Sequence, residues 1–218
     1  MIIQSDIVDK RQAILDSTLE LIKDNGFHGT PVSQIAKKAG VAAGTIYHYF
    51  PSKDSLILEI HSKIKAQMVE AMFKDVDSKK EYKQQFFEGW INLCKFFINN
   101  SSALIFTEQF NNSPFAKIAA EHETKASVNK FHEFFQAGMD KGYLKQMEYM
   151  LIASVVFGCI TATAKYHIAG RFDFTDNDLC SIANILWDGI KFKNSKGCLE
   201  NDKQSEKANL IKSSKKSL

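Results

Sequence analysis

The 218-residue sequence predicts an all-α protein, and two observations carry this prediction. Apolar residues recur at helical spacing over long stretches, whereas the strict alternation typical of strands is absent over any useful length. The three prolines and eleven glycines are few, and most lie between these periodic stretches. With 44% hydrophobic residues, the chain has enough apolar side chains to bury a substantial core.

Three helices are predicted before residue 51. The first spans about residues 7–24 and ends at Asn25-Gly26, because glycine readily takes the left-handed conformation found at helix ends. Two short helices follow over residues 32–39 and 43–50, and a tight turn that begins at Gly40 separates them. Pro51 ends the third helix.

The remainder is expected to form longer helices. Ser52 is predicted to cap a long fourth helix. Further helices are expected over about residues 78–98, 103–110, 114–139, 147–168 and 176–192, the last beginning in a capping box with Asp178 in place of glutamate. No linker separates the first four helices from the rest, so the fourth helix is expected to join the two parts rigidly.

This organisation suggests three regions. Residues 8–68 are predicted to form an N-terminal domain, and residues 69–192 a helical C-terminal domain. Residues 193–218 hold seven lysines against three acids and few apolar residues, which predicts a disordered basic tail. The N-terminus lacks the pattern of a signal peptide, and the longest uncharged stretch, residues 149–164, is shorter than the ~20 residues of a membrane span. We therefore expect a cytoplasmic protein without membrane contact.

Motifs for catalysis, metals and cofactors do not occur in the sequence. The four cysteines have no CxxC spacing, the histidines lack metal-binding spacing, and Glu121-His122-Glu123 differs from HExxH. GxSxG, P-loop and GxGxxG motifs are also missing. The sequence therefore predicts no enzyme, no metal site and no cofactor. The cysteines are expected to be free thiols, with redox sensing left as an alternative.

The two short helices around the Gly40 turn are typical of a helix-turn-helix, whose second helix enters the DNA major groove. Ile46 and Phe50 are expected to pack inward. The groove-facing side would then present Ala43, Gly44, Tyr47 and His48. Tyr47 and Tyr49 could instead be core aromatics, but the four consecutive rings of residues 47–50 cannot all face inward on one helix.

The same segment is suited to contact phosphate. Thr45, Tyr47 and Tyr49 supply hydroxyls, and Lys53 lies at a helix start, where backbone N–H groups also favour an anion. No acidic residue occurs between Ser33 and Lys53, which fits contact with a polyanion.

The stretch from Arg11 to Leu56 closely resembles the N-terminal domain of the TetR family. The matching residues are Arg11, Ile14, Leu15, Gly26, Thr30, Ile35, Ala36, Ala39-Gly40-Val41, Gly44-Thr45-Ile46-Tyr47-His48-Tyr49-Phe50, Lys53 and Leu56. The resemblance implies about nine helices, a homodimer formed by the last two, and an effector cavity in the C-terminal domain. It also implies that Thr45, Tyr47, Tyr49 and Lys53 contact DNA, with Ser33 at the start of the first helix-turn-helix element. Ala42 and Ala43 depart from the polar residues common at these positions.

A mostly apolar cavity would suit a lipophilic ligand oriented by few polar groups. The candidate ligand contacts are three aromatic and six polar side chains from the C-terminal part: Phe106, Phe110, Phe135, Glu108, Gln109, Asn111, His132, Tyr166 and His167.

The helices over residues 147–168 and 176–192 are apolar nearly all round, so they must be covered on two sides. We expect a two-fold, four-helix interface with Val156, Ile160, Ile182 and Leu186 at its centre. The alternative is that both helices lie at the centre of a monomeric core.

Together these features predict a homodimeric repressor that binds a palindromic double-stranded DNA operator and is released by a small lipophilic effector. Two alternatives remain at this point. The chain could activate transcription or ignore small molecules, or it could be a lipophile-binding scavenger with a vestigial helix-turn-helix.

Overall fold

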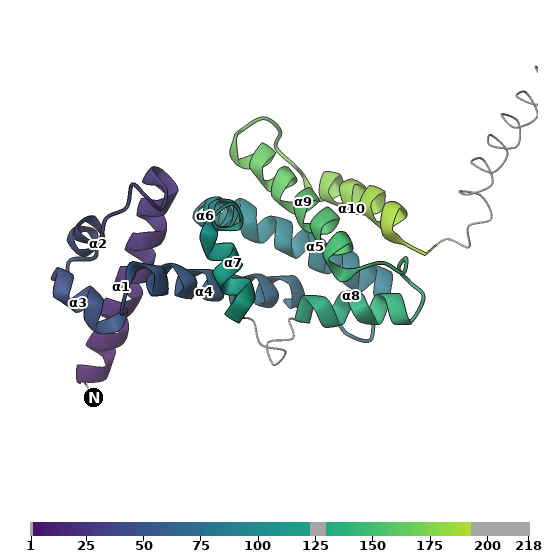
Figure 1. Ribbon diagram of the computed structural model, residues 1–218. Coiled ribbons are helices and arrows are strands. Elements are labelled where there is room, and N and C mark those ends of the chain that lie inside the picture. Colours follow the sequence, from purple (N-terminus) through teal and green to yellow (C-terminus); the bar gives the residue numbers. More distant parts are fainter. Residues whose placement is uncertain (1, 123–129, 193–218) are drawn as a thin grey trace, which may run out of the picture.

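The computed structural model describes residues 2–122 and 130–192, and these residues form ten α-helices and no strand. The all-α prediction is confirmed. The helices are α1 (Ile2–Asn25), α2 (Val32–Ala39), α3 (Ala43–Tyr49), α4 (Lys53–Phe73), α5 (Tyr82–Asn99), α6 (Ser101–Asn111), α7 (Pro114–His122), α8 (Lys130–Asp140), α9 (Tyr149–Ile168) and α10 (Asp176–Ile190). Helices α1 to α3 form a headpiece at one end, and α4 runs from it into a helical body (Figure 1).

The headpiece is held by a small apolar core. Ile14, Ile22, Ile35 and Leu56 are fully buried, and together they join α1, α2 and α4. Gly40 ends α2 with φ at 67°, and the N–H of Val41 donates to the carbonyl of Ala36 at 3.0 Å. A side chain with a Cβ is strained at such a φ, so glycine is what permits the tight turn into α3.

Helix α4 connects the headpiece to the body. Its 21 residues correspond to about 32 Å of helix. The Ser52 hydroxyl accepts from the N–H of Ser55 at 3.0 Å, and the Ser55 hydroxyl accepts from the N–H of Ser52 at the same distance. This reciprocal capping box confirms the predicted start of the helix. Beyond the headpiece, α4 packs against α5, α6 and α7.

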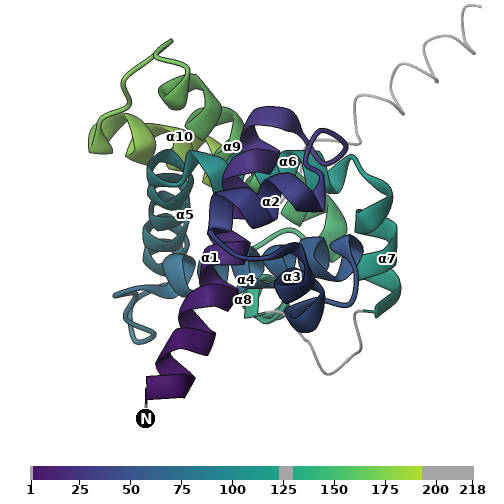
Figure 2. The ribbon, with the colours of Figure 1, turned by 90° about the vertical axis from the view of Figure 1, so that its left-hand side faces the viewer.

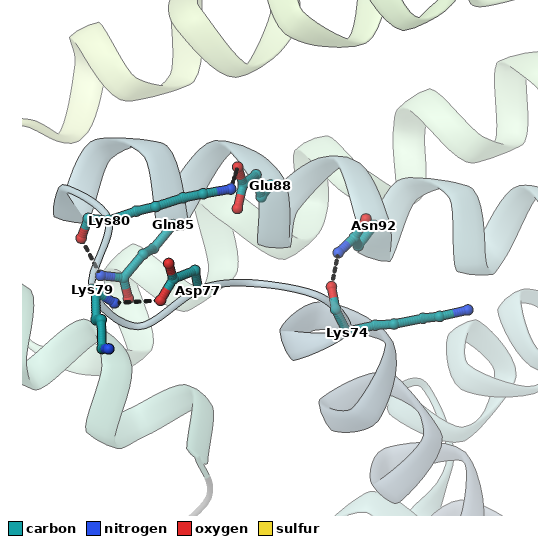
Figure 3. Close-up of polar contacts among 7 residues, drawn as sticks. All are labelled: Lys74, Asp77, Lys79, Lys80, Gln85, Glu88 and Asn92. Carbon is teal, nitrogen blue, oxygen red and sulfur yellow. Dashed lines mark hydrogen bonds and ion pairs between the residues drawn. The ribbon is translucent and has the colours of Figure 1, made fainter.

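Helix α5 begins at Tyr82, four residues later than predicted, because residues 77–81 make a hydrogen-bonded turn (Figure 3). The N–H of Lys79 donates to Asp77 Oδ1 at 2.8 Å, and Gln85 Nε2 donates to the carbonyl of Lys80 at 2.7 Å. The Lys80 ammonium lies 2.6 Å from Glu88 Oε1. Asn92 Nδ2 also donates to the carbonyl of Lys74 at the end of α4, at 2.9 Å. These bonds fix the antiparallel pairing of α4 and α5.

The body is built around α5, which packs against α4, α9 and α10. The second capping box is present, because the Thr175 hydroxyl accepts from the N–H of Asp178 and the Asp178 carboxylate accepts from the N–H of Thr175.

The predicted long helix over residues 114–139 corresponds to α7 and α8, with residues 123–129 outside the described part. The predicted basic tail, residues 193–218, also lies outside it.

Candidate functional site

Helix α3 has one buried and one exposed side. Ile46 and Phe50 are 2% and 1% exposed, as expected for residues that anchor the helix on the headpiece. Tyr47 is 54% exposed, and His48 lies exposed beside it. Ala43 and Gly44, at the start of the helix, are also exposed, so the backbone there is open to close approach. Figure 2 views the molecule from the side on which α2 and α3 lie.

Around this exposed side lie the predicted phosphate contacts. Thr45 and Tyr49 are half-buried, and Ser33 is exposed on the first turn of α2. No side chain caps α2, whose N-cap residue is Pro31, so its first backbone N–H groups are open to an anion. Sequence reasoning about side chains missed these uncapped N–H groups, although Pro31 before the helix signals them.

Lys53 is the first residue of α4 and is half-buried. Its ammonium donates to the carbonyl of Phe27 at 2.5 Å, and burial lowers its pKa. The lysine is therefore held beside the loop after α1, next to α3, rather than extended into solvent. Its charge therefore lies at the N-terminus of α4, four residues after the end of α3.

A cavity of about 220 Å³ lies in the body between α4, α5, α6, α8 and α9. Its apolar wall comes mainly from Ile64, Met68 and Met72 of α4, Phe86, Trp90 and Leu93 of α5, Phe131 and Phe135 of α8, and Val156, Phe157 and Ile160 of α9. Its polar wall members are His61, Lys65, Thr107, Asn111 and Tyr149. Such a lining suits a lipophilic molecule oriented by a few polar groups.

Two of the predicted ligand contacts, Phe135 and Asn111, line this cavity. Phe106 and Phe110 are instead fully buried core residues of α6. Glu108 forms an ion pair with Lys165 at 2.7 Å.

The other candidates also have roles elsewhere in the fold. Gln109 donates to the carbonyl of Ile22 at 3.4 Å, and the His132 ring packs edge-on against Tyr149 at 4.7 Å. Tyr166 is 51% exposed, and His167 Nδ1 accepts from the N–H of Phe174 at 3.2 Å. None of these four side chains is part of the cavity wall.

Sequence reasoning missed the contribution of α4 to the cavity. His61, Ile64, Lys65, Met68 and Met72 line it, and they repeat at helical spacing on one face of α4. This stripe, apolar at Ile64, Met68 and Met72, continues past the headpiece, where only the body can cover it. The periodicity of α4 alone could therefore have revealed it.

The cavity and the headpiece are in contact through α6. The His61 ring, in the cavity wall, stacks on Phe110 with centroids 3.9 Å apart, and Phe110 packs on Phe106 at 5.9 Å. Phe27, in the loop after α1, meets both Phe106 and Phe115 edge-on at 5.5 Å. Because the Phe27 carbonyl accepts from Lys53, packed aromatic rings connect the cavity wall to the lysine that begins α4.

The four predicted interface residues lie on the inner sides of their helices. Val156, Ile160 and Leu186 are buried within the single chain, and Ile182 is half-buried. Other apolar side chains point outward from α9 and α10: Met150 (71% exposed), Leu151 (59%), Val155 (54%) and Ile185 (74%). Helix α9 is long and apolar enough to cross a membrane by length and composition alone, and 28% of its most apolar stretch is buried.

Metal-binding clusters do not occur among the residues that the structure describes. Cys94 is buried beside Cys159, and burial raises the pKa of the Cys94 thiol. A protonated thiol is a poor nucleophile, which disfavours the alternative of redox sensing at Cys94.

Two family profiles match the chain. Residues 14–60 match the bacterial regulatory proteins of the tetR family, and residues 81–191 match the tetracyclin repressor-like C-terminal domain. A fatty acid metabolism regulator protein of Bacillus subtilis is 40% identical over 76 residues, which are 35% of this chain and only 39% of that protein. An uncharacterised helix-turn-helix transcriptional regulator of Haemophilus influenzae is 28% identical over 84% of this chain and 96% of its own length.

Solved structures of other proteins superimpose on most of this chain. A TetR family transcription regulator from Marinobacter aquaeolei superimposes with a TM-score of 0.77 and 25% identity, over 88% of this chain and all of that one. The transcriptional regulator FadR from Bacillus subtilis, solved in complex with stearoyl-CoA, has a TM-score of 0.64 and 25% identity over 81% of this chain and 95% of its own. The exposed face of α3, the cavity in the body and these matches agree: the chain belongs to the TetR family of DNA-binding transcription regulators.

Proposed function

We propose that this protein is a cytoplasmic, homodimeric repressor that binds a palindromic operator and is released by a small lipophilic molecule in the cavity of the body. The observation that carries the proposal is the run of aromatic contacts from His61 in the cavity wall to Phe27 beside Lys53. A lipophilic effector is supported by the apolar cavity wall and by the stearoyl-CoA bound to the Bacillus subtilis FadR, a fold relative.

The proposed release follows from the position of α4. A ligand between α4, α5 and α6 favours a conformation in which α4 and α6 move apart or rotate, and α1 follows α6 through Phe27. The two recognition helices of a dimer must match half-sites about 34–36 Å apart, so a shift of a few ångströms misplaces one of them. Because the coupling is reciprocal, operator DNA must weaken ligand binding by the same factor.

A gel-shift assay tests this function directly. The probe is the DNA upstream of the protein's own gene, with a scrambled duplex of the same composition as control. We expect a specific shift that the coenzyme A thioesters of saturated long-chain fatty acids reverse. A specific shift that no lipophile reverses would favour a regulator that ignores such ligands. Lipophile binding without any specific shift would favour the scavenger alternative.

Lys53→Ala is expected to weaken operator binding by about the same factor on every sequence and to lower the salt slope of log K by about one, because one phosphate contact is lost. Fluorescence anisotropy with a labelled operator at several salt concentrations measures both quantities. Lys74→Ala, at the opposite end of α4, is the matched control and should leave both unchanged. An unchanged slope for Lys53→Ala would show that this lysine only supports the loop at Phe27.

A further inference from the structure

Trp90 is the one cavity-lining residue in the described part of the chain that has a buried polar atom without a partner. It is 1% exposed, and its indole Nε1 has no hydrogen-bond partner. The other such atom, Glu88 Oε2, belongs to a carboxylate whose second oxygen already accepts from Lys80 at 2.6 Å. A buried N–H without a partner has lost its hydration with nothing in return, so the position calls for an acceptor.

The surroundings of Trp90 determine which acceptor fits. On α5 its neighbours in the cavity wall are Phe86, Gly89 and Leu93, and Met68 and Met72 face them from α4. Gly89 allows α4 to approach closely, because a Cβ there would lie 3.0 Å from Met72 Cγ. An ionised group would lose its hydration among these side chains, whereas an uncharged oxygen loses much less.

The extent of the cavity wall indicates the size of the ligand. On α4 the wall extends from His61 to Met72, and on α9 from Tyr149 to Ile160. Each run advances eleven residues along its helix axis, which corresponds to a length of about 16 Å. The wall therefore follows α4 and α9 over about three turns each, and Trp90 lies among its apolar members on α5.

We propose that Trp90 is a specificity-determining residue whose indole N–H donates to an uncharged oxygen within the apolar body of the effector. The ligand class is an extended lipophile that carries a carbonyl, ester, thioester or ether oxygen inside its chain, rather than a plain hydrocarbon. The inference rests on the proposal that this cavity is the effector site.

The test compares matched ten-carbon probes. Decane and the 2-, 3-, 4- and 5-decanones are equilibrated with the full-length protein, and gas chromatography of the vapour gives the free concentration and hence Kd. One ketone isomer is expected to bind about tenfold more tightly than the others, because all four lose the same hydration on leaving water and only the best-placed oxygen gains the hydrogen bond to the indole N–H. In Trp90→Phe this preference should disappear. Each protein serves as its own control, because the ratio of two Kd values cancels any loss of packing.

A second readout uses the wild-type protein alone. The chain has two tryptophans, so a ¹H–¹⁵N spectrum contains two indole cross-peaks, and Trp187→Phe assigns them. The preferred ketone should move the Trp90 peak downfield, whereas decane should not. Three results would overturn the proposal: equal Kd values for the four ketones, no binding of any probe, or a preference for one ketone isomer that survives in Trp90→Phe. Because the assay contains no DNA, a failure of operator release would not change its result, and the two proposals can fail separately.

Discussion

Val155→Glu is expected to produce a soluble monomer whose operator affinity is lower by a factor of about 100 or more. Val155 is 54% exposed, and Leu151, one turn before it on the same face of α9, is 59% exposed. In the proposed dimer this face meets its symmetry mate, so the substitution places two carboxylates against apolar surface. A monomer holds only one half-site and loses the avidity of two. Analytical ultracentrifugation and gel-shift titration measure the two effects.

Val156→Glu is the neighbouring control for this experiment. Val156 is 6% exposed and lines the cavity, so a glutamate there would be buried within its own chain. We expect that variant to be unfolded or insoluble rather than a folded monomer. A Val155→Glu protein that still sediments as a dimer would show that this face of α9 is not the interface.

The second large effect is expected for Phe27→Ala, which should lower the free energy of unfolding by about 3 kcal/mol and uncouple the ligand from DNA. Phe27 is 9% exposed and packs edge-on against Phe106 and Phe115. Its removal leaves a void between the headpiece and the body. Denaturant titration measures the stability at fixed protein concentration, and a gel-shift assay with effector measures the uncoupling.

Phe172→Ala is the matched control, because Phe172 is 49% exposed and its ring contacts Phe174. It should change the free energy of unfolding by less than about 0.5 kcal/mol. If Phe27→Ala lost its stability but still released the operator at the wild-type effector concentration, the aromatic contacts would be structural and the signal would run through α4 alone.

The features that could be predicted from the sequence depend on local rules. The Gly40 turn, the inward packing of Ile46 and Phe50, and the capping box at Thr175 each follow from a few adjacent residues, and the structure has all of them. The predicted start of α5 was wrong because the turn before it is stabilised by Gln85, a side chain from the helix itself.

The cavity and the outward face of α9 and α10 were harder to predict from the sequence, because they depend on how helices pack across the body. Phe106 and Phe135 look alike in the sequence, yet the first joins the headpiece to the body and the second lines the cavity. Likewise Val155 and Val156 are adjacent, and only the rotation of α9 against α5 decides which of them is exposed. Periodicity shows that α9 has two apolar faces but does not say which one packs on its own chain.

In the proposed dimer both faces of helix α9 therefore make contacts. Val156 and Ile160 on its inner face line the cavity, and Leu151 and Val155 on its outer face would meet the partner. Only the thickness of one helix then separates the effector from the other subunit. A ligand that shifts α9 in one subunit alters the packing of α9 in the other, so the first molecule bound changes the affinity for the second. The dose–response curve of derepression should accordingly be sigmoidal, with a Hill coefficient between about one and two.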